Sequence, residues 1–235
     1  NRHGGYSGMT PGGFSDYAQK MARRISLPER RLLIGGDHLG PHPWRQQPAG
    51  SAMAEALQLV SDCSAAGYGK IHLDAGMALG DDAGPHLPME TSAKRAAQLC
   101  LAAEKARPKA CLAPFYVIGA EIPTPGGSLA RPADVPVTEP SEVADFIAIC
   151  RRAFQRIDLA DAWSRVVAVV VQPGIDFGST WVAPYDRHAC SNLSAYHDRM
   201  PDPITFEIHA TDFQRPEALA QMVADHFPLL KVGPC

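Results

Sequence analysis

The stretch Val166-Val167-Ala168-Val169-Val170-Val171 decides the fold class. It is apolar at every position, so both faces of a strand built from it must be buried. Strands buried on both faces are typical of a parallel sheet that is covered by helices on each side. The sequence therefore indicates an α/β protein in which this stretch is a central strand.

The same pattern recurs on both sides of this stretch. Short apolar runs alternate with longer amphipathic stretches, which is the arrangement of β-α-β units. The predicted strands are 31–36, 70–74, 115–119, 166–171, 204–208 and 229–232. The predicted helices are 12–24, 49–66, 91–106, 139–156, 184–199 and 215–225.

This alternation predicts a single (β/α)8 TIM-type barrel domain over residues 1–235, with an open doubly wound sheet as the alternative. The predicted strands are fewer than the eight that a closed barrel needs. A glycine-rich loop from Gly4 to Pro11 begins the sequence as if a strand had just ended, and the sequence stops directly after a strand. We therefore expect the first strand or strands and the last helix to lie outside the sequence, so that the barrel is incomplete at both ends.

Composition and charge narrow the classes of function. A formal net charge of -3 and a pI near 6.3 give no basic field, which argues against a nucleic-acid partner. No apolar run approaches the roughly 20 residues of a membrane span, and no signal peptide is visible, so we expect a cytoplasmic protein without a membrane partner. The six cysteines are scattered singly, which indicates reduced thiols.

Each predicted strand ends in polar or glycine residues that packing alone does not require. Because the carboxyl ends of parallel strands lie on one rim of a barrel, these residues should converge. His38 and His209, with acidic residues at other strand ends, supply the imidazoles and carboxylates that suit zinc or manganese. Such a metal polarises a carbonyl or stabilises an enediolate. Asp37 is placed to move a proton to or from a hydroxyl group.

The candidate residues divide by expected role. The predicted catalytic residues are Asp37, Glu121 and Glu207, and the predicted metal ligands are His38 and His209. The predicted substrate-binding residues are His72, Asp74, Gln172, Asp212, Lys231 and Gly233. For any one of them the alternative is a structural role, as a hydrogen-bonded core histidine or a carboxylate that caps a helix. The remaining histidines, His197 and His226 among them, are assigned to the solvated surface.

Several motifs carry a resemblance to a known family. They are Gly35 to Pro41, Lys70 to Asp74, Val170 to Gly174, Phe206 to Asp212 and Asp225 to Pro234, together with Asn1 to Pro11 and Gly119 to Pro123. They resemble the D-tagatose-1,6-bisphosphate aldolase accessory-subunit family of the GatZ/KbaZ type, also labelled tagatose 6-phosphate kinase, over essentially the whole sequence. The resemblance implies hexitol (galactitol) catabolism, a phosphorylated ketose substrate and an aldolase catalytic subunit as partner. Assembly into a homo-oligomer is left open by the sequence. The kinase label finds no support, because the sequence lacks a G-x-x-x-x-G-K-[ST] loop.

The family in turn resembles, more distantly, the class II metal-dependent ketose-bisphosphate aldolases, in which an Asp-His pair ends one strand and further histidines end later ones. By this analogy Asp37 transfers a proton and His38 and His209 bind a divalent metal, with zinc expected and manganese as the alternative. Gln172 stands where those aldolases place another histidine, so the metal shell is completed from elsewhere or metal binding is lost. The candidates for completing it are Glu121, Glu207 and His72.

Two functions therefore remain open. The first is a metal-assisted sugar-phosphate enzyme, either a tagatose 6-phosphate 4-epimerase or a component of aldol cleavage. The second is a non-catalytic subunit that stabilises or activates a separate class II tagatose-bisphosphate aldolase, which should show an extended apolar patch away from the strand ends. The density of polar residues at the strand ends favours the first function, whereas the missing histidine favours the second. On the sequence alone we favour the enzyme.

Overall fold

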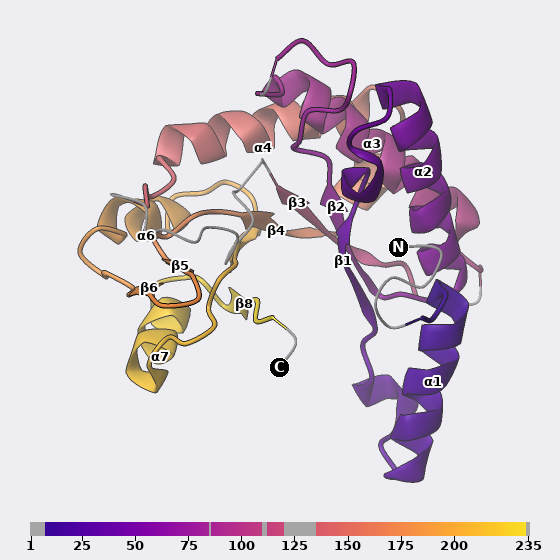
Figure 1. The fold of residues 1–235 in the computed structure, drawn as a ribbon, viewed down its shortest axis with the longest axis horizontal. Helices are drawn as coiled ribbons and strands as arrows, with labels where there is room; N and C mark the ends of the chain where they lie inside the picture. The colour runs from indigo at the N-terminus through magenta and orange to yellow at the C-terminus, as the bar shows by residue number, and fades with distance from the viewer. Residues whose placement is uncertain (1–7, 85, 110–111, 120–134, 234–235) are drawn as a thin grey trace. The chain divides into compact units, whose positions relative to one another are not determined.

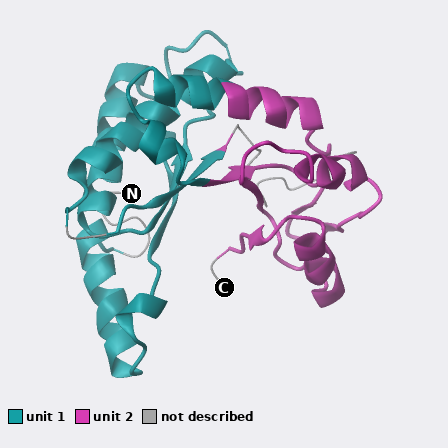
Figure 2. Cartoon of the chain, turned by 180° about the vertical axis from the view of Figure 1, so that it is seen from behind, with its two compact units in different colours: residues 1–118, 149–166 teal, residues 119–148, 167–235 magenta. Residues whose placement is uncertain are grey.

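The computed structural model describes residues 8–84, 86–109, 112–119 and 135–233. The chain forms two compact units, coloured separately in Figure 2. The first unit comprises Asn1–Ile118 and Ile149–Val166, and the second comprises Gly119–Ala148 and Val167–Cys235. Figure 1 labels most of the helices and strands.

Three parallel strands and their covering helices build the first unit. The strands are β1 (Gly35–Leu39), β2 (Lys70–Asp74) and β3 (Phe115–Gly119), and they lie in this order. The helices are α1 (Pro11–Arg24), α2 (Ala49–Ala65), α3 (Met89–Ala106) and α5 (Ala160–Trp163), with short 3-10 turns η1 (Glu29–Arg31) and η2 (His42–Trp44). Helix α2 packs against α3 and β1, and α3 packs against β2.

Small side chains allow the close packing of this helical layer. Ala52 and Ala56 of α2 and Ala93 of α3 are fully buried, so the two helix backbones approach each other closely. In β2, Ile71 and Leu73 are also fully buried. The strand thus belongs to the core of the unit and is covered by α3, as the parallel-sheet pattern predicts.

The second unit also contains three parallel strands. These are β4 (Val166–Val170), β7 (Thr205–Ile208) and β8 (Leu229–Leu230), in this order. An antiparallel hairpin joins β5 (Asp176–Phe177) to β6 (Val182–Ala183), and the helices are α4 (Pro140–Gln155, which runs on into the first unit), α6 (Ser191–His197) and α7 (Pro216–Ala224). Two fully buried aromatic rings, Phe206 and Phe227, stack with centroids 5.5 Å apart and anchor the core of this unit.

The predicted parallel α/β architecture is confirmed, and most predicted elements agree with the structure within two residues. Two elements had wrong bounds. The first strand runs over Gly35–Leu39 rather than over 31–36, and it starts later because Arg31 closes the 3-10 turn η1 that follows Pro28. The helix predicted over 184–199 is reduced to α6, and the β5–β6 hairpin and α5 were not predicted. The single domain and the closed eight-stranded barrel stay predictions.

Among the described residues, no helix combines the length and the apolar character that crossing a bilayer requires. Four cysteines, Cys63, Cys100, Cys150 and Cys190, are free and buried, which confirms the reduced state expected for them. Burial raises the pKa of the Cys63 thiol to about 12, so this thiol stays protonated at neutral pH and behaves as a small apolar side chain.

Candidate functional site

An irregularity in β1 exposes two neighbouring polar side chains. The pairing of β1 with β2 shifts register between Gly36 and Leu39, as in a β-bulge. In a regular strand successive side chains point to opposite faces, but here Asp37 and His38 are both exposed while Gly36 and Leu39 are buried. His38 adopts a left-handed backbone conformation with φ 47°. Strain of this kind is retained where the surroundings enforce it, often at functional sites.

Asp37 is the centre of what we call the first polar cluster, formed by Asp37, His38, Lys70 and His72. Its carboxylate oxygens lie 3.6 Å from Nδ1 of His38, 3.6 Å from Nδ1 of His72 and 3.9 Å from Nζ of Lys70. The two imidazole rings are tilted, with centroids 5.1 Å apart. His72 is buried, whereas about half of the Asp37 and His38 side chains is exposed. A half-exposed carboxylate among two imidazoles and an ammonium group can hold a cation or exchange a proton.

A glycine fixes the end of β1 against the end of β2. A Cβ atom at Gly40 would lie 1.6 Å from the backbone oxygen of Asp74, so no other residue fits there. This close approach holds the strand ends that carry Asp37 and His72 next to each other. Asp74, a predicted substrate-binding residue, is half-buried at the end of β2, and its backbone serves this packing.

The second polar cluster, formed by Glu207, His209 and Lys231, lies in the second unit. Glu207 points from β7, His209 follows β7 and Lys231 follows β8. Oε1 of Glu207 lies 3.4 Å from Nε2 of His209 and 3.4 Å from Nζ of Lys231, and that ammonium group is 3.0 Å from Nε2 of His209. Glu207 is fully buried, and the other two side chains are at most 15% exposed. A buried carboxylate is retained only when it is paired, so each member depends on the others.

Three further predicted residues lie in loops of the second unit. The side-chain oxygen of Gln172 accepts a hydrogen bond of 3.0 Å from the backbone N–H of Ile175, so it supports its own turn. Asp212 accepts a hydrogen bond of 2.8 Å from the backbone N–H of Gly233. A Cβ atom at position 233 would lie 3.1 Å from that carboxylate, so glycine permits the contact. The two loops after β7 and β8 are therefore joined at their predicted substrate-binding residues.

The structure thus groups the predicted residues within each unit. Asp37, His38 and His72 lie together in the first unit, and Glu207, His209 and Lys231 lie together in the second. Glu121 lies outside the described residues. The convergence of all these residues on one pocket stays a prediction.

Sequence reasoning missed Lys70 as a member of the first polar cluster. It opens β2, where a lysine reads as an ordinary solvated strand end. The available signal was its spacing: Lys70 and His72 are two residues apart in a strand and so project from the same face.

Sequence reasoning also missed an ion pair that orders the loop between β2 and α3. The buried guanidinium of Arg95 donates hydrogen bonds of 2.9 and 2.7 Å to the two carboxylate oxygens of Asp82. The hydrogen bond from Arg95 holds the pKa of Asp82 below its ordinary value. The Asp82 carboxylate also accepts a hydrogen bond of 2.6 Å from the backbone N–H of Leu79, which completes the turn.

Fold and site together define a class: an α/β protein whose parallel strands carry clustered histidines, carboxylates and lysines at their carboxyl ends. Ligands of α/β proteins bind at these ends, and the donor types suit a divalent metal or an anionic substrate. Comparison with known proteins places the chain more narrowly. The chain belongs to the GatZ/KbaZ-like family, because the model of the D-tagatose-1,6-bisphosphate aldolase subunit GatZ/KbaZ-like family matches residues 1–235.

Individual relatives agree with this assignment. Curated proteins named D-tagatose-1,6-bisphosphate aldolase subunit GatZ, from Salmonella paratyphi B and Salmonella typhimurium, are each 42% identical over 235 residues. A crystal structure of a probable tagatose 6 phosphate kinase from Sinorhizobium meliloti 1021 is 41% identical, with a TM-score of 0.87 over the whole chain. The chain spans 55% of the length of each of these relatives.

Proposed function

We propose that the chain belongs to a supporting subunit of a D-tagatose-1,6-bisphosphate aldolase, one that stabilises or activates a separate catalytic subunit. The observation that carries the proposal is the family match over residues 1–235, together with curated relatives named as subunits of this aldolase. Of the two functions that the sequence leaves open, this match favours the supporting subunit over the 4-epimerase.

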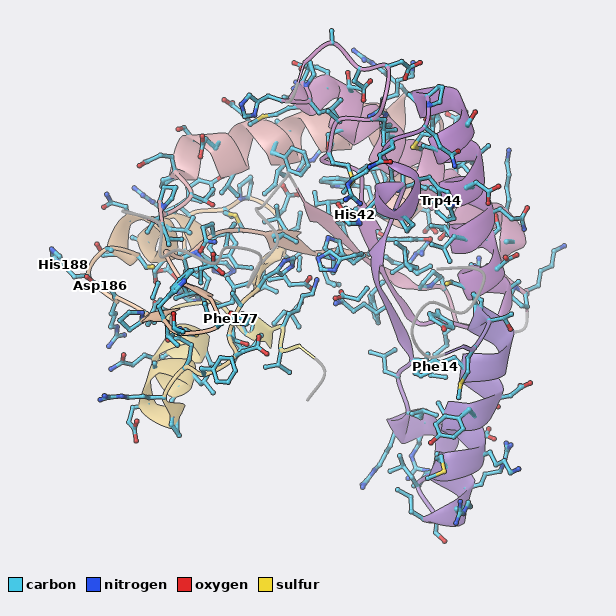
Figure 3. All side chains as sticks on the ribbon, viewed as in Figure 1. Phe14, His42, Trp44, Phe177, Asp186 and His188 are labelled. Atoms are coloured by element: carbon cyan, nitrogen blue, oxygen red, sulfur yellow. The ribbon has the colours of Figure 1, made fainter. Side chains whose placement is uncertain are left out.

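An exposed apolar face on α1 supports the same function. Phe14, Tyr17, Met21 and Ile25 are 40%, 49%, 37% and 72% exposed. Their spacing of three and four residues places them along one side of the helix, on which Figure 3 labels Phe14. A supporting subunit needs apolar surface away from the strand ends, because burial of such surface drives association. We assign this face to contact with the catalytic subunit.

Metal-assisted chemistry on a phosphorylated ketose is a second candidate, favoured by the first polar cluster. His38 and His72 would help to hold a divalent metal, and imidazole ligands suit zinc better than manganese. When bound, the metal polarises the substrate carbonyl. Asp37 is the residue placed to hold or move a proton at a sugar hydroxyl, because it is half-exposed and lies beside both imidazoles and Lys70.

One set of experiments separates the two functions. The purified protein is mixed with the catalytic subunit of a class II tagatose-bisphosphate aldolase, and the mass of the complex is measured by light scattering after gel filtration. In parallel, the protein alone is incubated with tagatose 6-phosphate or tagatose 1,6-bisphosphate, with and without zinc or manganese. The proposal predicts a complex and no turnover by the protein alone. Turnover without a partner would establish the second candidate, and the absence of a complex would overturn the first.

The apolar face of α1 offers a direct variant. Combined Phe14→Ser and Tyr17→Ser substitutions are expected to weaken the complex at least about tenfold, because they remove apolar area from the proposed interface on α1. Leu112→Ser is the matched control, since Leu112 is 93% exposed on the same unit but lies outside α1. Equal loss of the complex in both variants would remove α1 from the interface.

A further inference from the structure

A cluster of metal-ligating side chains lies in the second unit, away from the second polar cluster. His197 ends α6, Asp198 follows it and His226 precedes β8, and their ligand atoms all lie within 4.8 Å of one another. Nε2 of His226 is 2.9 Å from Oδ1 of Asp198, and the two imidazole rings are stacked with centroids 4.3 Å apart. We propose that these three residues form a zinc-binding site that ties the end of α6 to the turn between α7 and β8.

The position of this cluster in the fold separates it from the strand-end residues discussed above. His197 precedes β7 and His226 precedes β8, whereas His209 and Lys231 follow these same strands. The cluster therefore lies at the amino-terminal end of the parallel strands. Active sites of α/β barrels lie at the carboxyl ends of the strands, so the expected role of a metal at the amino-terminal end is structural.

The hydrogen bonding of His197 leaves one of its ring nitrogens available to a metal. The ring forms a hydrogen bond with the backbone of Ile204, while its Nε2 atom is buried and has no hydrogen-bond partner. The bond to Ile204 is therefore made by Nδ1, and a donating Nδ1–H leaves the lone pair of Nε2 available. This arrangement is the usual support behind a metal-bound histidine.

Zinc binding requires the side chains to turn as well as to separate, because imidazole lone pairs lie in the ring planes and two rings stacked at 9° do not point theirs at one metal. Zinc binds nitrogen and carboxylate oxygen at about 2.0 to 2.2 Å, so neighbouring ligand atoms of a tetrahedral site lie about 3.3 to 3.6 Å apart. The contact of 2.9 Å between His226 and Asp198 opens by a few tenths of an ångström to reach this spacing. Asp198 has 67% of its side chain exposed and can move, and a water molecule would complete the fourth position.

The surroundings of the cluster favour a cation. Helices α6 and α7 both end beside it, and the carboxyl end of a helix carries partial negative charge. On the inner side, the ring of His197 contacts the edge of Phe206 at a centroid distance of 5.2 Å, and Phe206 is fully buried. This apolar wall excludes water from one side of the ligands, whereas Asp198 and His226 remain accessible from solvent.

The backbone at His226 provides an independent observation. The residue has φ 73° and follows Asp225, the C-cap of α7. The backbone N–H of Phe227 donates a hydrogen bond of 2.9 Å to the carbonyl of Met222, which completes a Schellman motif. Glycine is the preferred residue at this position of the motif, so a histidine is held there against its backbone preference. This strain makes His226→Gly an informative variant, since it removes a ligand and suits the backbone.

The test measures zinc binding directly. Chelator-treated protein is titrated with zinc chloride by calorimetry, and its melting temperature is measured with and without zinc. We expect His226→Gly to fold at least as well as the unchanged protein but to bind one zinc equivalent fewer and to lose the associated rise in melting temperature. Asp198→Asn should weaken the same equivalent at least about tenfold. His188→Ala, an exposed histidine on the loop before α6 (Figure 3), is the matched control and should bind zinc normally.

Each result decides the proposal. The site is supported if His226→Gly binds one zinc equivalent fewer than the unchanged protein while His188→Ala binds the same number. Zinc that binds elsewhere would be bound equally by all variants. The proposal is overturned if the unchanged protein binds no zinc. It is equally overturned if His226→Gly and Asp198→Asn bind zinc as the unchanged protein does, or if His188→Ala loses as much as they do.

Discussion

Removal of Lys231 isolates the electrostatic contribution of the second polar cluster. Lys231→Met keeps most of the side-chain volume but removes one charged partner of the fully buried Glu207, whose contact with His209 at 3.4 Å is retained. Breaking a buried ion pair by removing one partner costs about 3 to 5 kcal/mol. Because His209 remains and the distance from Nζ to Oε1 is 3.4 Å, the lower end applies, about 3 kcal/mol. This loss corresponds to roughly a hundredfold change in the folding equilibrium constant.

The assay is urea denaturation followed by circular dichroism. Adding Glu207→Gln to Lys231→Met removes the uncompensated charge as well, so the double variant should recover at least about half of the lost stability. Lys94→Met, an exposed lysine on α3, serves as the control and should change the free energy of unfolding by less than about 0.5 kcal/mol. A Lys231→Met variant as stable as this control, or a double variant less stable than the single one, would refute the reasoning.

Three further predictions concern the first unit. Asp37→Asn should leave stability within about 0.5 kcal/mol, since the side chain is half-exposed, and should abolish any zinc-dependent turnover of tagatose 6-phosphate; a fully active variant would exclude the carboxylate from proton transfer. Gly40→Ala should lower the free energy of unfolding by more than about 2 kcal/mol because its Cβ meets the backbone of β2, whereas Gly50→Ala, with open space around it, should be neutral or stabilising, and equal urea midpoints would contradict this. The lowered pKa of Asp82 contributes stability that is present above its unfolded value of 3.8 and is lost as pH falls through the lower folded value. Arg95→Met should remove this part of the acid dependence. If the difference in melting temperature between the unchanged protein and Arg95→Met stays the same from pH 6 to pH 2, the prediction is wrong.

The sheet could be predicted because its strands are buried on both faces. The run Val166 to Val171 has no polar position, and Lys70 to Asp74 places Ile71 and Leu73 in the core. Both runs are therefore stable only as strands of a sheet that is covered on both faces. The start of β1 could not be predicted in the same way. Apolar residues before Gly35 continue the pattern of a strand, but the 3-10 turn after Pro28 uses the backbone of Arg31, and hydrophobic pattern does not encode that turn.

The candidate site was predicted in part for a related reason. Positions after apolar runs identify strand ends, which is why Asp37 and His209 were chosen as candidates from the sequence. The bulge that exposes His38 beside Asp37 depends on the register with β2, which no local pattern fixes. The pairing of His197 with His226 depends on two helix ends meeting, so the sequence analysis, which assigned both to the solvated surface, did not predict that they meet.

The central claim, a supporting role for an aldolase, is tested most directly by the rate at which the catalytic aldolase subunit loses activity on warming. Cleavage of tagatose 1,6-bisphosphate by that subunit is followed over time with and without an equimolar amount of this protein. We predict that its half-life lengthens several-fold in the presence of the protein, while the protein alone shows no cleavage. An unchanged half-life and an unchanged rate of cleavage would contradict the account.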